Sequence, residues 1–169
     1  MRKSVKISVI RENDIKYTKH KIGEEALYIY QVLYYAKSIG FIEQPVYNYV
    51  QRGDSQSHLK IDNAWGDVAI ALRDKVRSMG VYEEYADTLN AFVLTAAAGY
   101  AKNIATNHSV SEYRQMTKEV THWLKENLDN GFPVDKKSMS AKARVVSMLL
   151  RQRLFGLIWL LSKGWNLIS

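Results

Sequence analysis

Two adjacent carboxylates, Glu24 and Glu25, open a long apolar run directly after Gly23 and are well suited to acid–base chemistry. The residues that follow predict a helix over 24–38, apolar on nearly all sides and ended by Gly40. A carboxylate in the first turn faces the positive end of the helix dipole, which favours its charged form. Such a group can take a proton from a hydroxyl as that oxygen attacks another centre. Acids are also common at helix starts for the same electrostatic reason, so a purely structural role is the alternative.

A second group of polar residues follows an aromatic and β-branched stretch at residues 41–50. This stretch predicts a strand, and Pro45 within it favours an edge or irregular strand over a central one. The pattern Tyr-x-Tyr-x-x-Arg-x-x-Ser occupies residues 47–55 and continues to His58. On local grounds alone the tyrosines alternate along the strand, and Arg52 is a solvated charge in the turn that follows.

The two motifs together resemble the last catalytic elements of bacterial family 2 glycosyltransferases, which transfer a sugar from a nucleotide-sugar donor with inversion. That family commonly has Gly-Glu-Asp before an aliphatic or aromatic helix. Residues 23–28 are similar, and Ile15-Lys16-Tyr17 stands where the family has an apolar-aromatic strand. The resemblance implies that Glu25 is the catalytic base, with Glu24 beside it. Because the family has aspartate there, the extra methylene of Glu25 moves the carboxylate by about 1.5 Å, and a misplacement of about 1 Å can lower a rate ~100-fold.

The same resemblance implies that Arg52 neutralises charge developing on the leaving diphosphate, with Ser55 and His58 as further substrate-binding residues. The family also carries an N-terminal nucleotide-binding sheet and an Asp-x-Asp metal motif. No Asp-x-Asp occurs in this chain, and only 22 residues precede Gly23. We therefore predict no cofactor or metal site here and expect a divalent cation, Mg or Mn, only in the complete enzyme. The chain is expected to be the C-terminal portion of such an enzyme, inactive alone.

The predicted fold is mainly α, a C-terminal helical bundle preceded by a small α/β remnant of the glycosyltransferase catalytic domain. The expected division is 1–58 for the remnant and 59–169 for the helical extension. Near the N-terminus, Ile7, Val9, Ile15 and Tyr17 are spaced as in a strand or loop. Apolar spacing then predicts a helix ended by Gly80 and a longer helix from Tyr82 to about Ile104. It also predicts a helix over 110–128, with Ser109 or Ser111 as its N-cap, and one or two helices between Ser140 and Leu161.

The composition is typical of a cytoplasmic protein. The chain has no cysteine, which excludes disulfides and thiolate chemistry. Its first residues lack the apolar core of a signal peptide. The longest uncharged apolar run, residues 154–161, is far shorter than the ~20 residues that a membrane-spanning helix needs. We therefore expect a cytoplasmic location, with peripheral association at the inner face of the membrane as a further expectation.

The formal net charge of +7 resides entirely in residues 136–169, because the rest of the chain carries equal numbers of basic and acidic residues. This tail contains no acid, and its cations alternate with apolar residues. One interpretation is a helix lying on an anionic membrane surface, where each nearby cation contributes about 1 kcal/mol. The other is that the tail closes the helical bundle and its cations cover the outside. Nucleic acid is the weakest of the candidate partners, because no recognition motif accompanies the charge.

Two classes of function follow. The first is the C-terminal part of a glycosyltransferase that acts on a glycan or lipid-linked acceptor in cell-surface polysaccharide synthesis. The alternative is a non-enzymatic helical module that dimerises, or recruits a membrane or partner, through its apolar first helix and basic tail. An apolar helix without a sheet to cover it tends to pack on a second copy, so a homodimer is the expected form of that module.

Overall fold

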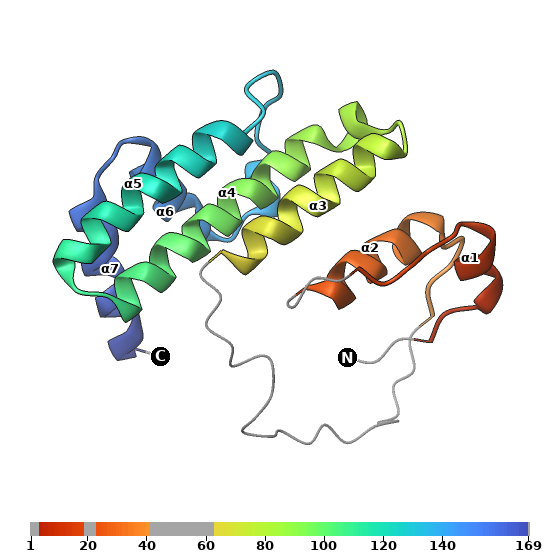
Figure 1. The fold of residues 1–169 in the computed structure, drawn as a ribbon, viewed down its shortest axis with the longest axis horizontal. Coiled ribbons are helices and arrows are strands. Elements are labelled where there is room, and N and C mark those ends of the chain that lie inside the picture. Colours follow the sequence, from red (N-terminus) through yellow and green to blue (C-terminus); the bar gives the residue numbers. More distant parts are fainter. Residues whose placement is uncertain (1–3, 19–22, 41–62, 169) are drawn as a thin grey trace. The chain divides into compact units, whose positions relative to one another are not determined.

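The structure is a computed structural model that describes residues 4–18, 23–40 and 63–168 (Figure 1). Within these ranges the chain is helical and has no β-strand, which confirms the mainly α class for this part. The predicted strand at 41–50 lies outside the described residues. The chain divides into two compact units, residues 1–60 and 61–169, and each is described by itself.

The first unit begins with a helix, α1 (Ile7–Glu12), where the sequence predicted a strand or loop. Val9, Ile10 and Asn13 are partly buried while Ile7 is exposed, so burial follows helical spacing rather than alternation. The Asn13 side-chain amide donates to the carbonyl oxygen of Val9 at 2.9 Å and satisfies the last turn. The prediction for this segment was wrong because Ile7 and Val9 alternate over too few residues to exclude a short helix, which places the two side chains on opposite sides. Ile15, after the helix, is buried.

The second helix, α2 (Glu24–Tyr35), is shorter and less buried than the sequence predicted. It ends at Tyr35 because Ala36 adopts an extended conformation, with ψ at 124°. The buried residues are Leu27, Ile29, Gln31 and Val32, and they cover more than half of the circumference because Leu27 and Ile29 lie on nearly opposite sides of the helix. The apolar side chains of the remaining strip are exposed to solvent in the described structure: Tyr30, Leu33 and Tyr34. The expectation of burial on several sides therefore holds for the part of the helix between Leu27 and Ile29 and is wrong only for this exposed strip.

The second unit is organised around one long helix, α4 (Tyr82–Asn107). The other elements of this unit all pack against it: α3 (Ala64–Ser78), α5 (Val110–Asn127), η2 (Lys136–Ser138), α6 (Ala141–Arg151) and α7 (Phe155–Ile168). Figure 1 shows α3, α4 and α5 running alongside one another. The buried face of α4 is rich in small side chains, which allow neighbouring helices to approach closely: Ala91, Ala96, Ala97, Ala98, Ala101 and Ala105.

Local signals set the helix ends in this unit. Gly80 has φ at 73°, a left-handed conformation that allows the chain to reverse between α3 and α4. Ser109 is the N-cap of α5, where its backbone N–H donates to the Glu112 carboxylate at 3.0 Å in a capping box. Ser140 caps α6, because its hydroxyl oxygen accepts the backbone N–H of Ala143 at 3.1 Å. Arg153 separates α6 from α7 with φ at 58°.

The predicted region between Ser140 and Leu161 thus forms two helices, and the second continues to Ile168. Their inner faces bury Val146, Leu150 and Ile158 in the core of the bundle. Among the described helices, none combines the length and the apolar character needed to cross a membrane.

Candidate functional site

The N-terminus of α2 presents the two carboxylates that the sequence singled out. Gly23 stands at the N-cap with φ at 79°, and its carbonyl accepts the backbone N–H of Leu27 at 3.0 Å. Glu24 and Glu25 form the first turn, and both side chains are exposed. The first N–H groups of a helix have no partner within the helix, so this end carries partial positive charge. Two acids open to an incoming hydroxyl therefore lie at a helix end that favours negative charge.

A pair of aromatic rings lies next to these acids. Tyr28 follows Glu25 by three residues and Glu24 by four, so it shares their face of the helix. Its ring stacks on that of Tyr17, with the centroids 4.3 Å apart and the planes within 7°. Tyr17 is 61% exposed, which leaves part of the stacked pair open to solvent. One turn along from the acids, α2 thus carries a flat aromatic surface.

The structure places only part of the predicted site. Glu24 and Glu25 are neighbours at one helix end, whereas Arg52, Ser55 and His58 lie outside the described residues, and their role stays a prediction. Within the described ranges, no group of three or more His, Asp or Glu side chains could hold a metal ion.

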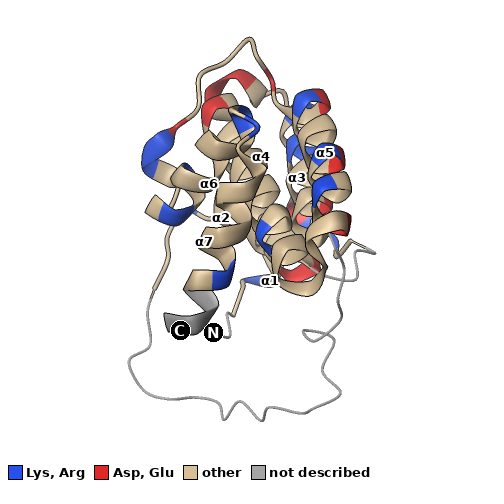
Figure 2. Ribbon diagram, turned by 90° about the vertical axis from the view of Figure 1, so that its left-hand side faces the viewer, with Lys and Arg blue, Asp and Glu red and all other residues tan. Residues whose placement is uncertain are grey.

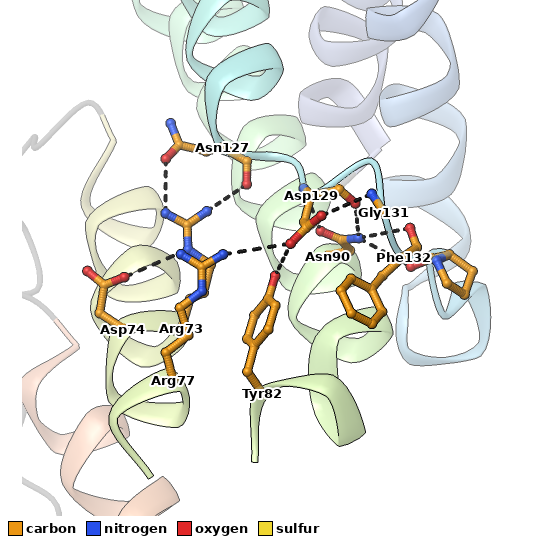
Figure 3. Close-up of polar contacts among 10 residues, drawn as sticks. Arg73, Asp74, Arg77, Tyr82, Asn90, Asn127, Asp129, Gly131 and Phe132 are labelled. Carbon is orange, nitrogen blue, oxygen red and sulfur yellow. Dashed lines mark hydrogen bonds and ion pairs between the residues drawn. The ribbon is translucent and has the colours of Figure 1, made fainter. Parts of the chain in front are cut away.

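A polar network that the sequence did not predict joins α3, α4 and the loop after α5 (Figure 3). The Tyr82 hydroxyl donates to Asp129 Oδ2 at 2.6 Å, and Arg77 Nη2 lies 3.7 Å from the same oxygen. The Arg77 guanidinium also lies over the Tyr82 ring, 4.4 Å from its centroid. We name this network the Asp129 cluster, and its members are Arg73, Arg77, Tyr82, Asn90, Asn127, Asp129, Gly131 and Phe132.

Asn90 is the buried centre of the Asp129 cluster. Its side-chain nitrogen donates to the carbonyl oxygens of Asp129 at 2.8 Å, Phe132 at 3.2 Å and Pro133 at 3.3 Å. Its side-chain oxygen accepts the backbone N–H of Asp129 at 3.0 Å. One side chain of α4 thus satisfies the backbone of a loop about 40 residues further along the chain, a pairing that the loop needs because buried peptide groups are costly when unpaired.

The last turn of α5 is held in the same network by Arg73. Its guanidinium Nη1 donates to the carbonyl oxygen of Asn127 at 2.8 Å, and this oxygen belongs to the final residue of α5. A cation at this position satisfies an end carbonyl and complements the negative end of the helix dipole. Arg73 and Arg77 are four residues apart and share a face of α3, so one helix fastens both α5 and the loop that follows it.

The contacts of the Asp129 cluster shift the ionisation of two of its groups. The hydrogen bond from Tyr82, followed by that from the Gly131 backbone N–H at 3.0 Å, lowers the pKa of the Asp129 carboxyl. Burial, followed by the hydrogen bond to Asp129, raises the pKa of Tyr82. At neutral pH the pair therefore consists of a carboxylate and a neutral phenol, which is the arrangement that a donated hydrogen bond requires.

We interpret the Asp129 cluster as structural, because its hydrogen bonds run among its own members and hold the loop against α3 and α4. The sequence indicated the loop through the turn residues at 130–133 but not its partners. The spacing of Arg73 and Arg77 was an available signal for a cationic stripe on α3. This spacing could not identify Asp129 as a partner, since the whole of α4 and of α5 lies between α3 and Asp129 in the sequence.

Comparisons of this chain with models of known protein families, with curated proteins and with solved structures gave no significant match. An argument for function therefore depends on the chain's own residues. Among the described residues, the exposed acid pair at the start of α2 is the feature with the most direct chemical use.

Proposed function

We propose that this chain is the C-terminal part of an inverting glycosyltransferase, which transfers a sugar from a nucleotide-sugar donor to a glycan or lipid-linked acceptor in cell-surface polysaccharide synthesis. One observation carries the proposal: two adjacent, exposed carboxylates form the first turn of α2 directly after a left-handed glycine. The reaction that we assign to this acid pair comes from the resemblance of residues 23–28 and 47–58 to family 2 enzymes.

In the proposed reaction Glu25 is the general base. Its carboxylate takes the proton of the acceptor hydroxyl while the oxygen forms a bond to the anomeric carbon, and the bond from that carbon to the diphosphate oxygen breaks on the opposite side. Arg52 would neutralise the negative charge that develops on the diphosphate as it leaves. Exposure of Glu25 supports this role, because a base must come within about 2.6–3.2 Å of the hydroxyl oxygen.

The surroundings of the acids also suit a carbohydrate. The stacked rings of Tyr17 and Tyr28 offer an apolar face with polar hydroxyls, and a sugar ring has the same two characters. Since Tyr28 lies one turn from Glu25, a ring resting on this pair would keep a hydroxyl near the carboxylate. The nucleotide-binding half is not among the residues of this chain, so we expect the chain alone to be inactive.

The experiment expresses this chain together with the in-frame sequence upstream of Met1 and measures transfer from a panel of nucleotide sugars. Glu25→Gln is expected to lower the rate by about 10²–10⁴-fold, because it removes the base and keeps the shape. Glu24→Gln is the matched control and is expected to stay within about tenfold of the parent rate. Glu25→Asp is expected to retain transfer, because it keeps the acid that the family uses.

Equal rates for Glu25→Gln and Glu24→Gln would contradict the assignment of the base. The absence of an upstream nucleotide-binding half would contradict the transferase itself. Calorimetry provides an independent check, since titration of this chain alone with nucleotide sugars and manganese is expected to give no heat. Tight binding by the isolated chain would show that the donor site has been misplaced.

The alternative function, a non-enzymatic module that forms a homodimer, is supported by a different feature. Tyr30, Leu33 and Tyr34 are each more than 40% exposed and lie together on one side of α2 at helical spacing. Analytical ultracentrifugation of the chain and of Leu33→Gln distinguishes the two proposals. A dimer that dissociates in the variant favours the module, and a monomer at all concentrations removes its main support.

A further inference from the structure

The outer faces of α6 and α7 carry a row of exposed aliphatic side chains in a part of the bundle that is otherwise well packed. The exposed members are Val145, Met148, Leu154, Leu157 and Leu160. The inner faces of the same helices are buried, so the bundle already has the apolar surface that it needs from them. Exposure of five large aliphatic side chains within sixteen positions therefore calls for a partner.

The charge of this region is of one sign. From Lys136 onward the chain contains seven basic residues and no acidic residue, and Figure 2 shows α6 and α7 with blue segments and no red ones. Arg144, Arg151 and Arg153 are exposed on or next to these helices. Lys163 is directed inward instead, because its ammonium lies 3.3 Å from the carbonyl oxygen of Thr106 and 5.6 Å from the Trp159 ring centroid.

Exposed cations and aliphatic side chains share the outer side of α6, and the exposed Arg153 directly precedes the aliphatic row of α7. On α6, Met148 follows Arg144 by four residues and precedes Arg151 by three, so both cations flank it on the exposed side. Leu154, directly before α7, and Leu157 and Leu160 within it follow one another at intervals of three and form a ridge. A surface in which arginines border aliphatic side chains is complementary to the boundary between phosphate headgroups and acyl chains.

We propose that the outer faces of α6 and α7 form a docking surface for a bilayer containing anionic phospholipids. The arginines contact the headgroup phosphates, and the aliphatic row enters the headgroup–acyl boundary without spanning the membrane. The inner faces of the two helices remain in the bundle, so closing the bundle and binding the membrane are compatible roles. This inference does not rest on the transferase proposal, because it uses no residue of the first unit.

Other occupants fit these observations less well. Nucleic acid would use the cations, but an aliphatic row adds nothing to phosphate contacts, and base stacking requires aromatic side chains. A second copy of the chain would oppose the same surface to itself and bring two sets of cations together without an acid to pair them. An anionic bilayer supplies both the negative charge and the apolar layer.

The experiment is co-sedimentation of the full chain with vesicles of phosphatidylcholine alone and of phosphatidylcholine mixed with phosphatidylserine. Binding is expected only to the mixed vesicles and is expected to weaken as salt is raised. Arg144→Gln with Arg151→Gln removes two cations, each worth about fivefold in partitioning, so about 25-fold weaker binding is expected. Leu157→Gln with Leu160→Gln keeps the charge and is expected to weaken binding by at least about tenfold, since two buried aliphatic side chains are lost from the boundary layer.

The matched control is Arg114→Gln with Lys118→Gln, which removes two exposed cations from α5 and leaves the proposed surface intact. It is expected to weaken binding much less than the arginine variant of α6, because these two cations belong to α5 and not to the proposed surface. All substituted side chains are exposed, so circular dichroism and thermal unfolding should match the parent chain. Equal weakening by the control, unchanged binding by the leucine variant, or no binding to the mixed vesicles would each overturn the proposal.

Discussion

Replacing Asn90 by alanine tests whether the second unit is fastened by the network at the start of α4. Asn90 is 3% exposed, and its amide is the polar group that α4 offers to three carbonyl oxygens and one backbone N–H of the loop at 129–133. The variant leaves these backbone groups without their partner. The loop must then open to water or keep unpaired polar groups in a buried place.

The magnitude follows from the number of bonds. The two hydrogens of the amide nitrogen serve three carbonyl oxygens, and the amide oxygen accepts one N–H, which amounts to three full hydrogen bonds. At about 1 kcal/mol net for each bond, their loss destabilises the unit by about 3 kcal/mol. Alanine returns about 0.5 kcal/mol through its better helix propensity. We therefore expect Asn90→Ala to lower the free energy of unfolding by about 2–3 kcal/mol.

The assay is urea unfolding followed by tryptophan fluorescence, because all four tryptophans of the chain belong to residues 61–169. With a slope of about 1–3 kcal/mol per molar urea, the midpoint is expected to fall by about 1–2 M without a change of slope. Asn103→Ala is the matched control, since Asn103 is an exposed asparagine of the same helix. It gains the same propensity and loses no bond to the loop, so its midpoint should stay near that of the parent chain.

A second variant separates loss of bonds from loss of volume. Asn90→Asp keeps the shape of the side chain and the acceptor toward Asp129, but it turns a carboxylate toward three carbonyl oxygens. At neutral pH it is expected to be at least as destabilised as Asn90→Ala, by about 2–3 kcal/mol or more. If Asn90→Ala and Asn103→Ala unfold within about 0.5 kcal/mol of each other, the loop is not held by this amide and the reasoning fails.

Three further predictions concern single contacts of the second unit. Tyr82→Phe removes the donor that lowers the pKa of Asp129 below its ordinary 3.8, so it should reduce the free energy of unfolding by about 1–2 kcal/mol at neutral pH. This difference from the parent chain should shrink as the pH falls through the lowered pKa of Asp129 in the folded state. Urea titrations at several pH values measure it. A constant difference at all pH values would show that the hydroxyl does not act through the carboxylate. Ser140→Ala removes the cap of α6 and should lower the free energy of unfolding, measured with urea, by about 1 kcal/mol. Ser140→Asn can also cap the helix and should keep most of this stability. Equal loss in both variants would exclude capping. Ser162 is buried and its hydroxyl has no hydrogen-bond partner among the described residues, so Ser162→Ala should leave thermal stability unchanged or raise it, and a loss of more than about 1 kcal/mol would mean that the hydroxyl is paired.

The helices of the second unit could be predicted because their information is local. The stripe of Val110, Tyr113, Val120 and Leu124 predicts α5 by spacing, and Ser109 marks its start. The same spacing did not identify every inward side chain. Trp65 shares helical spacing with the buried Val68 and Ala69 of α3 but is 51% exposed, and its ring lies beside that of Phe92.

Features that depend on distant partners could not be predicted. Asn90 meets its loop across 39 residues or more, and no local pattern distinguishes it from an exposed asparagine such as Asn103. The exposed side of α2 was also missed, because composition shows that a helix is apolar and not how much protein is available to cover it. At the candidate site, Glu24 and Glu25 were placed correctly at a helix start by their position after Gly23.

The packing of every other element of the second unit on α4 limits how the length of that helix can change. Each residue of an α-helix turns the following ones by about 100°, so one inserted residue in the middle of α4 would rotate its second half by more than a quarter of a circle. The buried alanines of the second half, such as Ala101 and Ala105, would then face the wrong neighbours, while the first half stayed in place. Variation in length should therefore be tolerated in connections that make no contact with the Asp129 cluster long before it is tolerated in α4.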